Sequence, residues 1–200
     1  MLRLIGAMCI TALVASACSS VRESSPERTA TEQLLISTAI DRAADKLNLE
    51  IPSGTRVFVD SGALEGPDAR YAASVVKDRI LKGGAHIALL RNEADAVVEL
   101  RAGALSIDDG QTLVGVPDFD IPIPLAGPMA FPEVPFYKQK ERKGVAKLAA
   151  TSYWVSDGRL IDSTGPQFGY SHEREDSFIM FSWRRSDLPE ESEPGLFDPW

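Results

Sequence analysis

The sequence contains few of the residues on which catalytic and metal sites are usually built. Only two of its 200 residues are cysteine, and only two are histidine. The cysteines are Cys9 and Cys18, so a chain cut before Cys18 would retain one thiol, which excludes an internal disulfide and a multi-cysteine zinc site. The motifs of serine hydrolases, P-loop proteins, dinucleotide-binding proteins and zinc proteases are also missing. We therefore expect no enzymatic activity, no metal and no cofactor.

Positive charge is scarce as well. The chain has 21 lysines and arginines against 29 aspartates and glutamates, which gives a net charge of −8. Arg3 is the only charged residue before Cys18, so cleavage at that point makes the remaining chain more acidic still. Because an acidic protein is repelled by the phosphates of nucleic acids, we expect no nucleic acid among its partners.

The N-terminal segment has the pattern of an export signal. Arg3 is followed by an uncharged, mainly apolar run over residues 4–14, which at roughly 11 residues is too short to span a bilayer but fits a signal peptide. Ala15-Ser16-Ala17-Cys18 then resembles the lipobox of bacterial lipoproteins, although Ala15 stands where leucine is usual. The alternative is a plain secretory signal cut at the same place. A cysteine at the first mature position favours lipidation of Cys18, and by analogy Ser19 favours the outer membrane.

These features divide the chain into four parts. We expect a signal peptide over residues 1–17, a lipid-anchored flexible tether over 18–27, one globular domain over 28–188 and an acidic, poorly ordered tail over 189–200. The protein would lie in the cell envelope, where its N-terminal lipid would hold it to the outer membrane facing the periplasm.

The first half of the domain alternates between helical and strand patterns. Thr29 and Glu32 form a capping-box pattern before a helical repeat that runs to about Leu47, and a second helix is expected from Pro67 to Gly83-Gly84. Strands are expected over residues 56–60, 86–90, 96–105 and 112–116, with Val98, Leu100, Ala102 and Ala104 on one face and Asp109-Gly110 forming a turn. This order predicts an α/β (α+β) fold in which two helices pack on a mixed sheet.

Residues 117–135 differ from their surroundings. Six prolines in this segment cannot lie inside a helix or a central strand. Between them stand apolar residues, namely Phe119, Ile121, Ile123, Leu125, Met129 and Phe131. We expect an extended loop that packs across the domain's own sheet. The alternative is an interaction loop, which would bind an envelope protein partner or face the membrane.

Strand patterns return after this loop. Strands are expected over residues 144–155, 160–163 and 177–183, with a turn at Asp157-Gly158. An acidic run between the last two strands contains His172, Glu173, Glu175 and Asp176. We interpret this run as a solvated loop, and a divalent-cation site is the less favoured alternative.

Several segments resemble a known family. They are residues 29–37, 113–117, 121–124, 132–133, 144–147 and 162–165. Together they resemble an uncharacterised family of bacterial lipoproteins that is defined only as a domain of unknown function, DUF6655. A second, purely architectural likeness is to the periplasmic domains of curli-secretion and flagellar-associated lipoproteins. The family resemblance implies no catalytic residue. We therefore expect a membrane-anchored envelope lipoprotein that acts as a non-enzymatic assembly or interaction module, and the alternative is an envelope protein that binds a small ligand or lipid.

Overall fold

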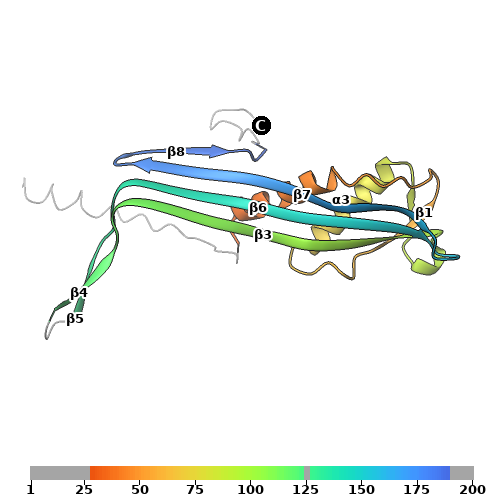
Figure 1. Ribbon diagram of the computed structural model, residues 1–200, viewed down its shortest axis with the longest axis horizontal. Helices are drawn as coiled ribbons and strands as arrows, with labels where there is room; N and C mark the ends of the chain where they lie inside the picture. The colour runs from red at the N-terminus through yellow and green to blue at the C-terminus, as the bar shows by residue number, and fades with distance from the viewer. Residues whose placement is uncertain (1–27, 124–126, 190–200) are drawn as a thin grey trace, which may run out of the picture.

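The computed structural model describes residues 28–123 and 127–189 (Figure 1). Two α-helices lie on a long, twisted sheet, and a two-stranded hairpin projects from one end of that sheet. The predicted fold, with two helices packed on a mixed sheet, is confirmed, and strands make up most of the domain. Cys18 lies outside the described residues.

The main sheet has six strands in the order β2-β1-β3-β6-β7-β8. β1 (Arg56–Asp60) is parallel to β2 (His86–Ile87) and to β3 (Ala96–Val116). The next strands, β6 (Val134–Trp154), β7 (Leu160–Phe178) and β8 (Phe181–Ser186), continue the sheet from β3 in antiparallel order. β4 (Phe119–Ile123) and β5 (Gly127–Phe131) form the separate hairpin between β3 and β6. A short 3₁₀ helix, η1 (Arg91–Glu93), connects β2 to β3.

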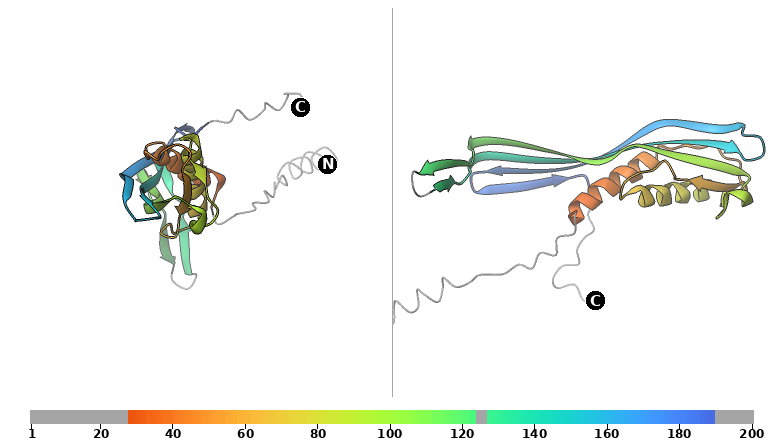
Figure 2. Two further views of the ribbon diagram at one scale, coloured as in Figure 1. Left: turned by 90° about the vertical axis from the view of Figure 1, so that its right-hand side faces the viewer. Right: turned by 90° about the horizontal axis from the view of Figure 1, so that it is seen from below.

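The two helices lie on the same face of the sheet (Figure 2). α2 (Ala30–Ala44) begins with the predicted capping box, because Thr29 Oγ1 accepts from the Glu32 N–H and the Glu32 carboxylate accepts from the Thr29 N–H. α3 (Ala69–Lys82) begins two residues after Pro67 and is capped at its C-terminus by Gly83. Their inner faces join the strands in one buried core, which includes Ile36, Ile40, Val76, Ile80, Val57, Val98 and Leu100.

Two glycines allow α2 to lie directly against the sheet. A Cβ atom at Gly169 of β7 would collide with the carbonyl oxygen of Ala39, and one at Gly144 of β6 would lie 2.5 Å from the carbonyl oxygen of Leu35. Both approaches are closer than any side chain permits. The Ser171 hydroxyl also donates to the Leu35 carbonyl at 2.6 Å. This contact fixes α2 across β6 and β7.

A bulge in β3 changes which residues face the helices. Ala102 pairs with Leu148 and Ala104 pairs with Lys147, so Gly103 is left without a partner across the sheet. The alternation shifts by one residue at this point. Leu105 and Ile107, rather than Ala104, therefore continue the row that packs on the core. The prediction that Ala104 shares a face with Val98, Leu100 and Ala102 is wrong.

Several strand boundaries also differ from those predicted. Asp109-Gly110 is not a turn, because it lies inside β3 opposite Arg142 and Glu141. The acidic run around Glu173 is not a loop but part of β7. The predicted strand over residues 177–183 contains the turn between β7 and β8, where Ile179 has a φ of 52°. The predicted strand over 86–90 is shortened to β2.

The helices cover only one half of the long strands (Figures 1 and 2). Beyond them the sheet continues as a four-stranded ribbon, here named the distal arm, made of residues 108–116, 134–143, 172–178 and all of β8. None of the buried hydrophobic side chains in the described part of the chain lies in these ranges. The arm is therefore held together by cross-strand contacts. We name the side of the sheet that carries the helices the helix face and the other side the open face.

Candidate interaction surface

The apolar residues predicted as an interaction loop are gathered on the β4–β5 hairpin. Phe119 pairs with Phe131 and Ile121 pairs with Met129. Because directly paired residues of antiparallel strands point to the same side, these four residues share one face of the hairpin. The rings of Phe119 and Phe131 stack with their centroids 5.0 Å apart. Leu125 and the side chain of Ile123 lie outside the described parts of the chain.

This hairpin face is exposed and does not pack on the sheet. The exposed fractions of the Phe119, Ile121, Met129 and Phe131 side chains lie between 37% and 50%. The hairpin extends away from the end of the distal arm (Figure 1), so the prediction that this segment packs across the domain's own sheet is wrong. Pro122 and Pro128 pair with each other, which is compatible with strand structure because each strand of a two-stranded hairpin has a free outer edge.

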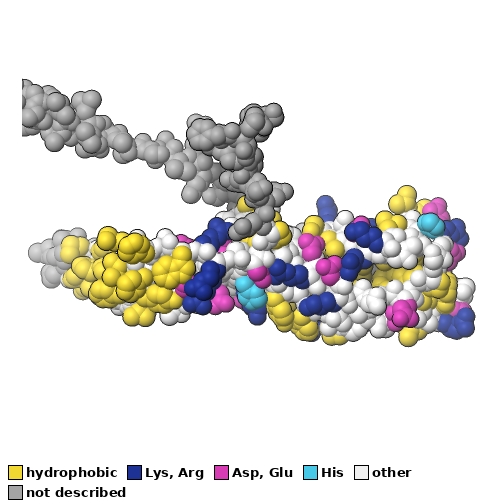
Figure 3. All heavy atoms as spheres, turned by 90° about the horizontal axis from the view of Figure 1, so that it is seen from above, with side chains coloured by type: hydrophobic (Ala, Val, Ile, Leu, Met, Phe, Trp, Pro, Cys, Tyr) yellow, Lys and Arg dark blue, Asp and Glu magenta, His cyan; other side chains and the backbone are white. Residues whose placement is uncertain are grey.

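A second apolar group extends this surface. The turn between β7 and β8 carries Phe178, Ile179, Met180 and Phe181, of which Met180 is 87% exposed. The ends of β3 and β6 add Val114, Val116, Val134 and Phe136, which are also exposed. We give the name apolar tip to the hairpin face, the β7–β8 turn and these ends of β3 and β6 together. Figure 3 shows hydrophobic side chains gathered at this end of the molecule, with lysines and arginines beside them.

The sequence prediction included the hairpin residues of the apolar tip but missed the β7–β8 turn. Phe178 to Phe181 are four apolar residues in a row and lie within the apolar strand expected over residues 177–183. A strand with one buried face alternates between apolar and polar residues. The four successive apolar residues break this alternation, which was the available signal of an exposed turn.

Behind the apolar tip, the open face holds a buried carboxylate. The Asp176 side chain is 1% exposed, and its Oδ1 accepts from the Tyr137 hydroxyl at 2.8 Å and from Arg174 Nε at 3.0 Å. Arg185 lies 3.4 Å from Oδ2. Burial raises the pKa of Asp176, but the hydrogen bonds from Tyr137 and Arg174 outweigh this and hold it below its usual range. An ionised carboxylate tied to three neighbours joins β6, β7 and β8 and is poorly suited to act as a general acid.

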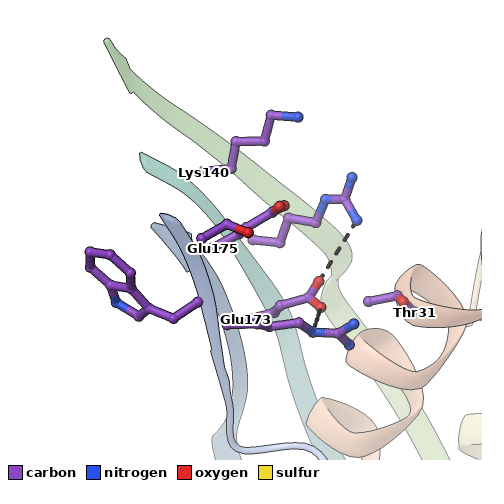
Figure 4. A pocket seen from close by; sticks show the side chains of 8 residues that line it. Thr31, Lys140, Glu173 and Glu175 are labelled. Carbon is purple, nitrogen blue, oxygen red and sulfur yellow. Dashed lines mark ion pairs between the residues drawn. The ribbon is translucent and has the colours of Figure 1, made fainter. Parts of the chain in front are cut away.

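On the helix face, an open cavity of about 300 Å³ lies between the start of α2 and the distal arm (Figure 4). It is lined by Thr31, Lys140, Arg142, Glu173, Glu175, Ser182, Trp183 and Arg184. Glu173 bridges two guanidinium groups, with Oε1 2.6 Å from Arg184 Nε and Oε2 3.7 Å from Arg142 Nη1. Three cations and two carboxylates line the cavity, so most of the charge is compensated within it, and the lining contains no pair of a nucleophile with a histidine. The geometry therefore points to a structural ion network.

The acidic run in β7 does not converge on one point. Successive side chains of a strand alternate between its two faces, so His172 and Asp176 lie on the open face while Glu173 and Glu175 lie on the helix face. Within residues 28–123 and 127–189, no three His, Cys, Asp or Glu side chains are grouped so that they could hold a metal ion. Asp120 pairs with Ala130, on the opposite face of the hairpin from Phe119.

A second cavity, between α3 and the segment that follows α2, is small. It has a volume of about 160 Å³ and is lined by residues that include Leu47, Ile51, Val76 and Ile80. Pockets that bind small molecules usually measure roughly 300–1,000 Å³. This cavity therefore gives little support to small-ligand binding.

The fold and its surface define an α+β domain with a projecting arm that ends in exposed apolar side chains. The sequence matches DUF6655, a family of unknown function, over residues 17–180. Because this match covers most of the chain, the protein belongs to that family. A comparison with curated proteins gave no match. No helix in the described part of the chain is long and apolar enough to cross a membrane.

Proposed function

We propose that this protein is a lipid-anchored lipoprotein of the cell envelope, that it acts as a non-enzymatic assembly or interaction module, and that the apolar tip is its contact surface. The proposal rests on one observation, the gathering of large exposed apolar side chains at one end of the molecule. Contiguous exposed apolar patches on soluble domains usually mark contacts with proteins or membranes, because water-exposed apolar surface is costly.

The length of the expected tether is compatible with this arrangement. The ten residue-to-residue steps from Cys18 to Arg28 can span at most about 35 Å. The distance from the start of α2 to the end of the hairpin can be estimated along β3. Thr31 of α2 lines the same cavity as Lys140, and Lys140 pairs with Gln111 of β3. The hairpin ends about twelve residues after Gln111. At about 3.3 Å per residue this is a similar length, roughly 40 Å. A fully extended tether could therefore bring a lipid on Cys18 close to the level of the apolar tip.

The anchor is tested by following the incorporation of labelled fatty acid. Cys18→Ala should abolish incorporation and release the protein from the membrane fraction or leave the precursor uncut. Cys9→Ala is the matched control, because it makes the same change inside the expected signal peptide and should leave labelling intact. If Cys18→Ala still incorporates the label, the protein is not anchored in this way.

The interaction role is tested by native mass spectrometry of protein extracted from its own envelope. A bound protein that is lost when the apolar tip is altered would support the proposal. A small molecule that remains bound to the tip variant would instead favour the alternative, a small-ligand or lipid-binding envelope protein.

A further inference from the structure

The distal arm has two free sheet edges. β3 pairs with β1 only from Ala96 to Glu99, so its outer edge from Leu100 to Val116 pairs with no strand among the described residues. β8 is the last strand at the other side of the sheet, and its outer edge is equally free within the described part. Free edges expose unpaired N–H and C=O groups and can accept a strand from another chain. Neither β8 nor residues 107–116 of β3 contain proline or lysine, two residues that commonly protect such edges.

The two free edges run in the directions that continuation of the sheet requires. β3, β6, β7 and β8 are antiparallel in succession, so β3 and β8 run in opposite directions. β8 of one copy and β3 of the next copy would therefore form another antiparallel pair. The edges belong to different strands, so the contact is head-to-tail and can be repeated from copy to copy.

We propose that the protein self-associates by pairing β8 of one copy with β3 of a second copy, with Arg185 opposite Asp108 and Arg184 opposite Asp109. The proposal goes beyond the function proposed above, because it uses the strand edges and needs neither the lipid nor the face of the β4–β5 hairpin. A second copy is favoured as the occupant because the two edges carry complementary charges.

The charges at the two edges determine the register. β8 carries Arg184 and Arg185, whose side chains are 57% and 67% exposed, and β3 carries Asp108 and Asp109, both exposed. Arg184 points to the helix face like Asp109, and Arg185 points to the open face like Asp108. A register that pairs these residues therefore keeps the helices of both copies on the same side. Shifting it by two residues in either direction loses both ion pairs.

Two other features fit the same register. It places Trp183 opposite Gly110, where nothing but the Glu141 carbonyl lies within 4 Å of a Cβ position, so an aromatic ring can cover the glycine. It also brings the β7–β8 turn, which carries Ile179 and Met180, beside the end of β3 around Leu113 and Val114. Exposed apolar side chains of the β7–β8 turn would thus be covered by the end of β3 in the next copy.

The decisive test is a disulfide cross-link in the full chain. Gln111 and Ser182 face each other in the proposed register, and both are exposed. Within one copy they lie three strands apart, roughly 14 Å, which is too far for a disulfide. The double variant Gln111→Cys, Ser182→Cys should give a ladder of covalent dimers, trimers and larger species under mild oxidation. Neither single variant should form this ladder. The double variant Thr112→Cys, Ser182→Cys should not form it either, because its two cysteines would point to opposite faces of the sheet.

A second test follows the oligomeric state by sedimentation in the absence of cross-links. Asp108→Lys, Asp109→Lys places like charges opposite the arginines and should weaken self-association by roughly tenfold or more. The control Glu50→Lys, Glu93→Lys makes the same change in net charge at exposed positions outside both β3 and β8. Circular dichroism establishes that each variant is folded. A protein that stays monomeric at high concentration, or a Ser182→Cys single variant that forms dimers efficiently, would overturn the proposal.

Discussion

Replacing both Phe119 and Phe131 by serine separates a contact surface from a structural hairpin. A fully buried phenylalanine contributes roughly 1.5–3 kcal/mol. Since these side chains are 45% and 38% exposed, we expect about half of that from each, and roughly 1 kcal/mol more from the stacking of the two rings. These contributions lie within the β4–β5 hairpin, which is a separate sheet.

The double variant should therefore loosen the hairpin locally and change the free energy of global unfolding by less than about 1 kcal/mol, because only contacts between the hairpin and the rest of the domain enter that value. The control is Ile40→Ala, which truncates a fully buried side chain of α2 and should cost about 2–5 kcal/mol. Both values are measured by urea unfolding followed by circular dichroism. The Phe119→Ser, Phe131→Ser variant should lose its association with the envelope partner. The folded fraction of the Ile40→Ala variant should retain it.

Two results would contradict this reasoning. If the phenylalanine variant loses as much stability as Ile40→Ala, the hairpin belongs to the core of the domain. If its stability is unchanged and its association is also unchanged, the β4–β5 face is not the contact surface, and the β7–β8 turn becomes the part of the apolar tip to test next.

Three further predictions concern the domain itself. Gly169→Ala should destabilise the domain by about 1–3 kcal/mol in urea unfolding because the new methyl group collides with the Ala39 carbonyl, whereas Gly165→Ala, with open space around it, should have little effect. Burial, together with the hydrogen bond that Tyr71 donates to Asp41 at 2.9 Å, raises the pKa of Tyr71 to about 12. The contribution of the neutral Tyr71 side chain to stability should be complete below about pH 10 and lost as the pH rises towards 12. Tyr71→Phe should remove one late step from the tyrosinate absorbance titration. Because the pKa of Asp176 is lowered in the folded protein, its contribution to folding stability should be complete above about pH 4 and lost as the pH falls further. Asp176→Asn should therefore reduce stability at pH 7 but flatten the acid side of a plot of urea midpoint against pH. An unchanged acid side would contradict the role assigned to this carboxylate.

The helices were predictable because their signals are local. The capping box at Thr29 and the glycines after Lys82 determine helix ends from a few neighbouring residues, and the structure has both. The parallel arrangement of β1 and β3 around a crossover helix also follows from the order of the elements.

The distal arm was not predictable because its strands depend on partners far away in the sequence. Asp109-Gly110 has the local signature of a turn, but pairing with Arg142 and Glu141 on β6 keeps this segment extended. The charged part of β7 lacks the alternation of apolar and polar residues that marks a half-buried strand, because both faces of the distal arm are polar there. The residues of the hairpin were recognised as a group, but whether they pack inward or project outward depends on the length of β3 and β6.

The continuity of β6 has a mechanical consequence. This one strand runs from Val134 in the exposed ribbon to Trp154 beneath the helices, without a break in its pairing to β3 other than the bulges at Gly103 and near Gly115. The local free energy needed to open its hydrogen bonds should therefore fall steadily from the covered end to the uncovered end. We therefore expect a force applied at the far end to be carried along the backbone to the layer under α2, where Gly144 and Gly169 let the helix lie directly against the sheet. Bending of the sheet should then be greatest where the helix coverage stops.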